Sequence, residues 1–128
     1  MIKIMLVDDQ PLVRQGLRMN LALEPDIQIV AEAGDGQTAL DLAKRLSPDV
    51  IVMDVAMPGM DGITVTQALR SLVPGSAVVI LTMNDEPHLR QRAQQAGASA
   101  FVTKSGGVKA LVAAIRLSAR GAATSLGG

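Results

Sequence analysis

The sequence has no cysteine, tryptophan or tyrosine, and Phe101 is its only aromatic residue. Without cysteine, disulfides, zinc–thiolate sites, iron–sulfur clusters and thiol nucleophiles are excluded. The single histidine, His88, leaves no histidine-rich metal site, and we interpret it as a partly exposed helix residue rather than a base. One aromatic ring gives no platform on which nucleic-acid bases or an isoalloxazine ring could stack.

Excess charge of one sign and long apolar runs are also missing. Twelve Lys and Arg balance twelve Asp and Glu, so the chain lacks the basic footprint of a nucleic-acid-binding domain. The apolar N-terminus stops at Asp8, which is too early for a signal-peptide core. The apolar stretch 50–60 is interrupted by Asp54 and by Pro58-Gly59, so it cannot span a bilayer. We expect a soluble, cytoplasmic domain that binds neither membrane nor nucleic acid.

What the chain does contain is a regular alternation of short segments. Its 128 residues, 48% of them hydrophobic, suffice for one compact domain. Five apolar runs rich in Val and Ile do not alternate with polar residues, which is typical of parallel strands buried on both faces. They are Ile2–Val7, Ile27–Glu32, Val50–Asp54, Ala77–Thr82 and Ala100–Thr103. A segment with helical spacing follows each run, the first marked by Leu12, Leu17, Leu21 and Leu23. The alternation predicts an α/β fold with helices on both faces of a parallel sheet.

Capping and turn residues agree with these boundaries. Pro11 suits the first turn of a helix, where its missing N–H costs no hydrogen bond. Asp35 and Asp61 are expected to be helix N-caps, and Gly97 is expected to follow the end of the fourth helix. Residues 121–128 are small and polar. We therefore predict a domain over residues 1–120 and a linker or tail over 121–128.

Polar side chains gather where the predicted strands end. In an open α/β sheet, ligands bind beyond the carboxyl ends of the strands. Asp8 and Asp9 follow the first run, Asp54 ends the third, Thr82 ends the fourth and Lys104 follows the fifth. Three crowded carboxylates repel one another unless a cation neutralises them, and a hard ion such as Mg²⁺ prefers oxygen ligands. A carboxylate nucleophile, Mg²⁺ and a lysine are the parts needed to transfer a phosphoryl group to an aspartate.

Each of these residues has a simpler explanation when taken alone. Asp8 or Asp9 could cap the first helix, and Asp54 could merely begin a loop. Thr82 could be an ordinary strand residue and Lys104 a solvated surface charge. Because all of them stand at strand ends, a shared site is the better interpretation.

Four motifs carry a resemblance to a known family. They are Leu6-Val7-Asp8-Asp9-Gln10-Pro11, the segment 52–62, Leu81-Thr82-Met83 and the segment 97–104. Over essentially its whole length the sequence resembles the receiver domain of bacterial two-component response regulators, within the NarL/FixJ branch. The resemblance implies a doubly wound, flavodoxin-like (βα)₅ fold with strand order 2-1-3-4-5, two helices on one face and three on the other.

The resemblance also implies a role for each motif residue. Asp54 would be the phosphoacceptor. Mg²⁺ would be held by Asp9, Asp54 and the backbone carbonyl of Ala56 directly, and by Asp8 through water. Lys104 would pair with the phosphoryl group, Thr82 would donate its hydroxyl to it, the N–H groups of Ala56 and Met83 would complete the cradle, and Phe101 would be the switch aromatic.

The implied partner is a cognate sensor histidine kinase, and a homodimer could form on phosphorylation. The output would be transcriptional, through a C-terminal helix-turn-helix domain that this chain lacks. The domain would not be an enzyme beyond catalysing its own phosphorylation and dephosphorylation.

Three positions depart from the common pattern of receiver domains. Ser105 follows Lys104 where many receivers have proline, which removes the usual reason for a cis peptide there. Ala56 and Met83 flank the phosphoryl group and could change how fast water removes it.

Three alternatives stay open at this point. The segment 34–39 matches the G-x-G-x-x-A dinucleotide fingerprint, but Asp35 would put a carboxylate where the pyrophosphate should sit. An aspartate-nucleophile phosphatase of the haloacid-dehalogenase type uses similar side chains, but its nucleophile is the first Asp of an Asp-x-Asp pair after strand one. A single-domain or degenerate receiver that acts only as an interaction module would not need the complete set of acidic residues, threonine and lysine.

Overall fold

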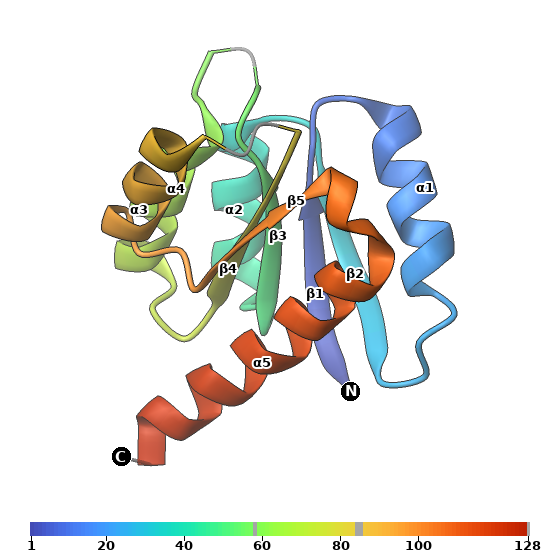
Figure 1. The fold of residues 1–128 in the computed structure, drawn as a ribbon. Coiled ribbons are helices and arrows are strands. Elements are labelled where there is room, and N and C mark those ends of the chain that lie inside the picture. Colours follow the sequence, from blue (N-terminus) through green and yellow to red (C-terminus); the bar gives the residue numbers. More distant parts are fainter. Residues whose placement is uncertain (58, 84–85, 128) are drawn as a thin grey trace.

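The computed structural model describes residues 1–57, 59–83 and 86–127, with side chains up to residue 120. Five parallel strands form one sheet in the order β2-β1-β3-β4-β5 (Figure 1). The strands are β1 (Ile2–Val7), β2 (Ile27–Ala33), β3 (Val50–Asp54), β4 (Ala77–Thr82) and β5 (Ala100–Thr103). The helices are α1 (Pro11–Leu21), α2 (Gly36–Leu46), α3 (Gly62–Leu72), α4 (Pro87–Gln95) and α5 (Gly107–Gly127). The predicted flavodoxin-like α/β fold is confirmed.

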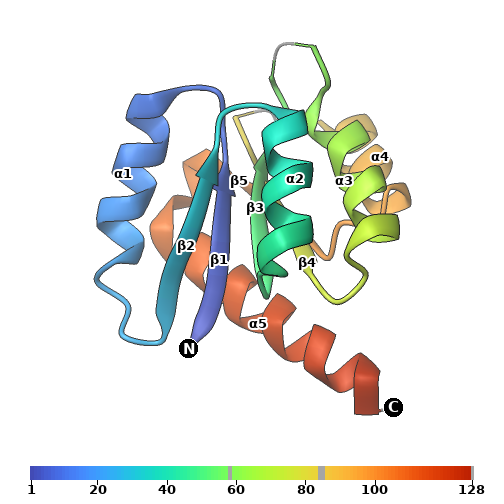
Figure 2. The same ribbon diagram turned by 180° about the vertical axis from the view of Figure 1, so that it is seen from behind.

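Helices cover both faces of the sheet. α1 and α5 lie on one face, and α2, α3 and α4 lie on the other (Figures 1 and 2). Alternate strand residues point to opposite faces, so each strand contributes to two apolar cores. The α1–α5 core contains Ile4, Leu6, Val52, Val79, Leu81, Val102 and Leu111, among others. The α2–α4 core contains Met5, Val7, Ile51, Met53, Ile80, Leu69 and Ala93, among others. Two buried faces explain why the strand sequences are apolar without alternation.

The helix ends follow the predicted capping residues. The Asp35 carboxylate accepts a 2.8 Å hydrogen bond from the Thr38 N–H, and Asp61 accepts one of 2.9 Å from the Thr64 N–H. Gly97 has a φ of +99°, the left-handed conformation expected just after a helix end. The capping role of Asp35 also removes the basis for a dinucleotide site at segment 34–39.

The first helix differs from its predicted pattern. Leu21 is fully buried and ends α1, but Leu12 is 81% exposed and Leu23 lies exposed after the helix. The spacing of the leucines therefore marks a helix without defining its buried face, because Leu12 points to solvent and Leu23 lies beyond the end of the helix.

Ion pairs join the last helix, α5, to the loop that precedes β2. Arg116 of α5 donates 2.9 Å hydrogen bonds to both carboxylate oxygens of Asp26 and one of 2.8 Å to Glu24, in the loop before β2. The α5 backbone continues through residues 121–127, where the sequence predicts a linker or tail, and Gly128 lies outside the described residues. Within the described ranges, no helix is long and apolar enough to cross a membrane.

Candidate active site

Three carboxylates meet at the carboxyl ends of neighbouring strands. Asp8 and Asp9 follow β1, Asp54 ends β3, and the two strands pair directly through Val7 and Met53. An oxygen from each of the three carboxylates lies within 4.8 Å of the others. Oxygen ligands of an octahedral Mg²⁺ stand about 2.1 Å from the ion, so opposite ligands are about 4.2 Å apart. The three carboxylates supply the oxygen donors that a hard divalent cation prefers, and they lie close enough together to hold one ion after small side-chain movements.

Asp8 is the most firmly held of the three. It is 3% exposed; its Oδ1 accepts a 2.9 Å hydrogen bond from the Gln10 N–H, and its Oδ2 lies 3.5 Å from the Lys104 Nζ. The N-cap of α1 is Gln10, so Asp8 does not cap that helix. The ion pair brings Lys104, which follows β5, to the acidic cluster at the carboxyl ends of β1 and β3.

Asp54 lies in an unfavourable environment for a charge. It is 9% exposed, and its Oδ1 accepts a 3.3 Å hydrogen bond from the Ala56 N–H. Burial, followed by the nearby Asp8 carboxylate, raises the pKa of Asp54, while Lys104 and the Ala56 N–H act in the opposite direction. A bound cation would favour the ionised form, because it would cancel the repulsion between the carboxylates.

The loop after Asp54 ends with Gly62 packed closely against the backbone of Asp54 and Val55. The Gly62 N–H donates a 3.0 Å hydrogen bond to the Val55 carbonyl at the start of α3. A Cβ at Gly62 would lie 2.0 Å from the Asp54 carbonyl oxygen, so only glycine fits. Pro58, which the sequence interprets as part of the turn after Asp54, lies outside the described residues.

Thr82 and Phe101 occupy the face of the sheet that α4 covers. Thr82 ends β4, is 4% exposed and pairs in register with Thr103, the residue before Lys104. Because strand residues alternate, Thr82 lies on the same face as Ile80, and Phe101 packs against that α2–α4 core. Met83, the next residue, is exposed. The Lys104–Ser105 peptide is trans, as are all the peptide bonds of the described residues.

One charged residue near the site has no signal in the sequence motifs. Arg14 of α1 donates a hydrogen bond from Nη1 to the backbone carbonyl of Asp8, and its Nε lies 3.3 Å from Glu32 on β2. The contact depends on α1 packing beside the β1–β2 end of the sheet. Helical spacing alone could not reveal it.

Comparisons with known proteins identify the family to which the chain is similar. Residues 4–116 match the family model of the response regulator receiver domain. The chain is 42% identical over 116 residues to response regulator GacA of Pseudomonas aeruginosa, covering 91% of this chain and 54% of GacA. It is 42% identical over 119 residues to the nitrate/nitrite response regulator protein NarP of Escherichia coli, covering 93% of this chain and 55% of NarP. The chain thus spans about half the length of these relatives.

A solved structure shows the same fold. A LuxR-family two-component response regulator from Aurantimonas sp. SI85-9A1 superposes with a TM-score of 0.89 at 39% sequence identity. The match covers 93% of this chain and 85% of that structure. With the family model spanning 113 residues, from 4 to 116, the chain belongs to the response regulator receiver domain family.

Proposed function

We propose that this receiver domain accepts a phosphoryl group on Asp54 from a sensor histidine kinase, in a reaction that requires Mg²⁺. The observation that carries the proposal is the meeting of Asp8, Asp9 and Asp54 at one sheet edge, with Lys104 paired to Asp8. Receiver domains accept phosphoryl groups and interact with sensor kinases as a family.

The phosphotransfer needs a nucleophile and a way to handle added charge. An Asp54 carboxylate oxygen forms a bond to phosphorus while the bond from phosphorus to the donor nitrogen of a phosphohistidine breaks, and that electron pair remains on the imidazole. A bound Mg²⁺ supplies Lewis-acid neutralisation of the phosphoryl oxygens. Asp9, Asp54 and the Ala56 carbonyl would hold it directly, and Asp8 would do so through water.

Lys104 and the Ala56 N–H would stabilise the product. The Lys104 ammonium lies 3.5 Å from an Asp8 oxygen, beside the acidic cluster, and would pair with the new phosphoryl oxygens. The Ala56 N–H, which donates to Asp54 Oδ1, already points at the reacting carboxylate. The Met83 N–H would complete the cradle, and the exposed Met83 side chain would flank the phosphoryl group and change how fast water removes it.

The signal would leave through Thr82 and Phe101. A phosphoryl group adds about −1.5 to −2 charges and three acceptor oxygens. If the Thr82 hydroxyl turns toward them, space opens beside β4 on the face that Phe101 shares. The Phe101 ring carries no hydroxyl, so turning it inward buries no polar group.

The relatives of this chain are longer than the receiver domain. The chain matches the part of GacA and NarP that amounts to about half of each, and one structural neighbour belongs to the LuxR family. We propose transcriptional control through a C-terminal helix-turn-helix domain, with a cytoplasmic location and a homodimer formed on phosphorylation. The receiver itself, with a net charge of zero, would contact no nucleic acid.

A turnover assay separates this function from a phosphatase. With acetyl phosphate and Mg²⁺, a receiver takes up one phosphoryl group per chain, whereas a phosphatase releases many equivalents of phosphate from p-nitrophenyl phosphate. We expect stoichiometric labelling that excess EDTA abolishes, and no appreciable turnover of the phosphomonoester. Labelling that persists in EDTA would contradict the Mg²⁺ requirement, and rapid turnover would favour the phosphatase.

A further inference from the structure

We propose that Arg14 is a positioning residue of the cation site, because it fixes the peptide that joins Asp8 to Asp9. This inference rests on the proposed Mg²⁺ site. The described contacts of Arg14 are with the Asp8 carbonyl oxygen and with Glu32, and not with the carboxylates of Asp8, Asp9 or Asp54. It would therefore act through the backbone that carries Asp8 and Asp9.

The contacts of Arg14 bridge three elements. From α1, its Nη1 donates to the carbonyl oxygen of Asp8 after β1, and its Nε lies 3.3 Å from Glu32 Oε1 on β2. The Arg14 side chain is only 19% exposed, so solvent competes little for these bonds. The Asp8 N–H donates a 3.1 Å hydrogen bond to Ala33. Both backbone polar groups of Asp8 are therefore tied to neighbouring elements.

The carbonyl group that Arg14 binds influences the orientation of both Asp8 and Asp9. A peptide unit is planar, so the Asp8 carbonyl oxygen lies in one plane with the Cα atoms of Asp8 and Asp9. Anchoring that oxygen restrains the direction from which both acidic side chains leave the backbone. Groups that orient metal ligands without touching the metal commonly change metal affinity by about 10–100-fold when removed.

The surroundings leave the guanidinium little freedom. A Cβ at Gly34 would lie 3.3 Å from Arg14 Nη1, which is tighter than ordinary packing. Glycine at this position therefore leaves room for the guanidinium beside the Asp8 carbonyl. A lysine could not replace it, since its single ammonium on an unbranched stem lacks the planar fork that reaches Glu32 and Asp8 together.

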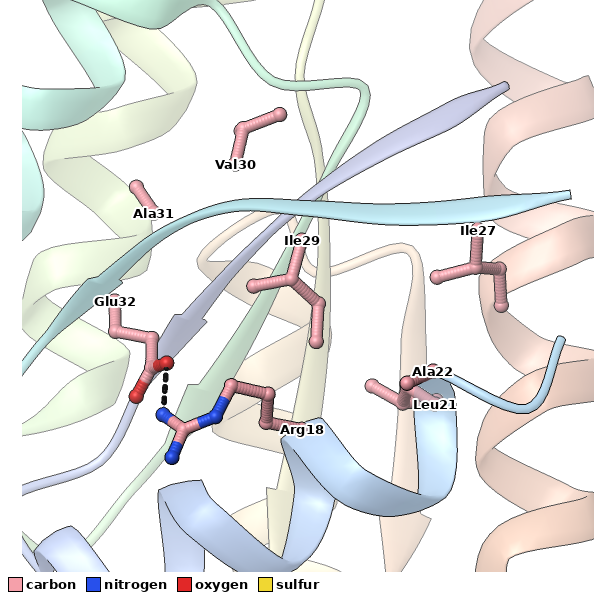
Figure 3. A pocket seen from close by; sticks show the side chains of 8 residues that line it. All are labelled: Arg18, Leu21, Ala22, Ile27, Ile29, Val30, Ala31 and Glu32. Atoms are coloured by element: carbon pink, nitrogen blue, oxygen red, sulfur yellow. Dashed lines mark hydrogen bonds and ion pairs between the residues drawn. The ribbon is translucent and has the colours of Figure 1, made fainter. Parts of the chain in front are cut away.

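Arg18 provides a matched control on the same helix. Its Nη1 pairs with the other carboxylate oxygen of Glu32. Figure 3 shows Arg18 and Glu32 facing each other beside the groove between α1 and β2. Arg18 thus shares a partner with Arg14 and is one helical turn farther along α1. No described contact joins it to Asp8.

The test is a Mg²⁺ titration of the whole chain followed by amide NMR shifts, because the sequence has no tryptophan or tyrosine to report binding by fluorescence. Arg14→Gln should raise the Kd for Mg²⁺ about 10-fold. Arg18→Gln should leave it within about twofold of the wild-type value, as expected for a group that does not orient a ligand. Arg14→Lys keeps the charge and should still weaken binding. It also carries the test if Arg14→Gln does not fold.

The outcomes separate this inference from the proposed function. A wild-type Kd in Arg14→Gln or Arg14→Lys would overturn the positioning role. An equal loss in Arg18→Gln would also overturn it, because the effect would then belong to the Glu32 ion pairs. Failure of the wild-type chain to bind Mg²⁺ at all would instead count against the proposed site itself.

Discussion

The guanidinium of Arg90 lies over the ring of Phe101, with its Cζ 4.6 Å from the ring centroid. Arg90 belongs to α4 and Phe101 to β5, so the contact links the helix to the strand beside Thr82. Phe101 is the only phenylalanine of the chain, which has no tyrosine or tryptophan that could replace it. A cation–π contact at an exposed site contributes about 0.5–1 kcal/mol, which is enough to bias the orientation of a ring.

Removing Arg90 should therefore release Phe101. In Arg90→Ala we expect the ring to turn toward Thr82 more often, with the ratio of its two orientations changing about two- to fivefold. Ring chemical shifts of labelled Phe101 measure this ratio. Arg92→Ala, at another exposed arginine of α4, is the control and should leave the ring unchanged. Identical Phe101 shifts in wild type and Arg90→Ala would show that the contact does not hold the ring.

Thr82 should couple phosphorylation to α4 and β5. Thr82→Ala keeps Asp54 and should still take up the phosphoryl group, but it should lose most of the shift changes at α4 and β5 that beryllofluoride induces. The physical reason is that no hydroxyl remains to move toward the added acceptor oxygens. Thr82→Ser retains the hydroxyl and should respond as wild type does. A full response in Thr82→Ala would exclude this route.

Two glycines should respond to alanine in opposite ways. A Cβ at Gly62 would meet the Asp54 carbonyl at 2.0 Å, so Gly62→Ala should cost about 3 kcal/mol as backbone shifts to relieve the clash. Gly16 lies inside α1 with open space around it, and Gly16→Ala should stabilise by about 0.5–1 kcal/mol. Thermal unfolding measures both. A Tm for Gly62→Ala equal to that of the wild type would mean that the loop after Asp54 adapts freely.

Much of this structure could be predicted because it depends on local pattern. The apolar runs define the strands to within one residue, with β2 ending at Ala33 instead of Glu32. Asp35 and Asp61 cap helices because their bonds reach only three residues ahead. The strand-end rule also brings together Asp8, Asp9 and Asp54, since it depends only on strands being parallel and adjacent.

What the sequence does not reveal depends on contacts between distant elements. Arg14 reaches the Asp8 carbonyl only because α1 packs beside β2, and no spacing along the chain encodes that. The sequence pattern predicts that Arg90 belongs to a solvated face of its helix, yet its guanidinium lies over the ring of Phe101 on β5. Leu12 fits a buried helical stripe and is exposed, because the pattern of leucines in α1 is compatible with more than one buried face.

The Arg116–Asp26 pair should make stability depend on pH in one direction. The hydrogen bonds from Arg116 hold the pKa of Asp26 below its ordinary value of 3.8. When folding lowers the pKa of a carboxyl group, that group stabilises the folded state at pH values above its pKa in the unfolded chain. The stabilisation is lost as the pH falls through the pKa of the group in the folded state. Asp26→Asn should therefore have a lower Tm than wild type at neutral pH, and the difference should close well below pH 3.8. A difference that is constant across this range would contradict the linkage.

The central claim is that Asp54 is the residue that takes up the phosphoryl group. Intact-mass analysis after incubation with acetyl phosphate and Mg²⁺ tests it most directly, with Asp54→Asn and Asp49→Asn compared against wild type. Asparagine keeps the shape of Asp54 without its nucleophilic charge, and Asp49 lies just before β3, at the opposite end of the strand from Asp54. We predict a gain of one phosphoryl group in wild type and Asp49→Asn, and none in a folded Asp54→Asn. A labile phosphoryl adduct on Asp54→Asn would show that another residue is the acceptor.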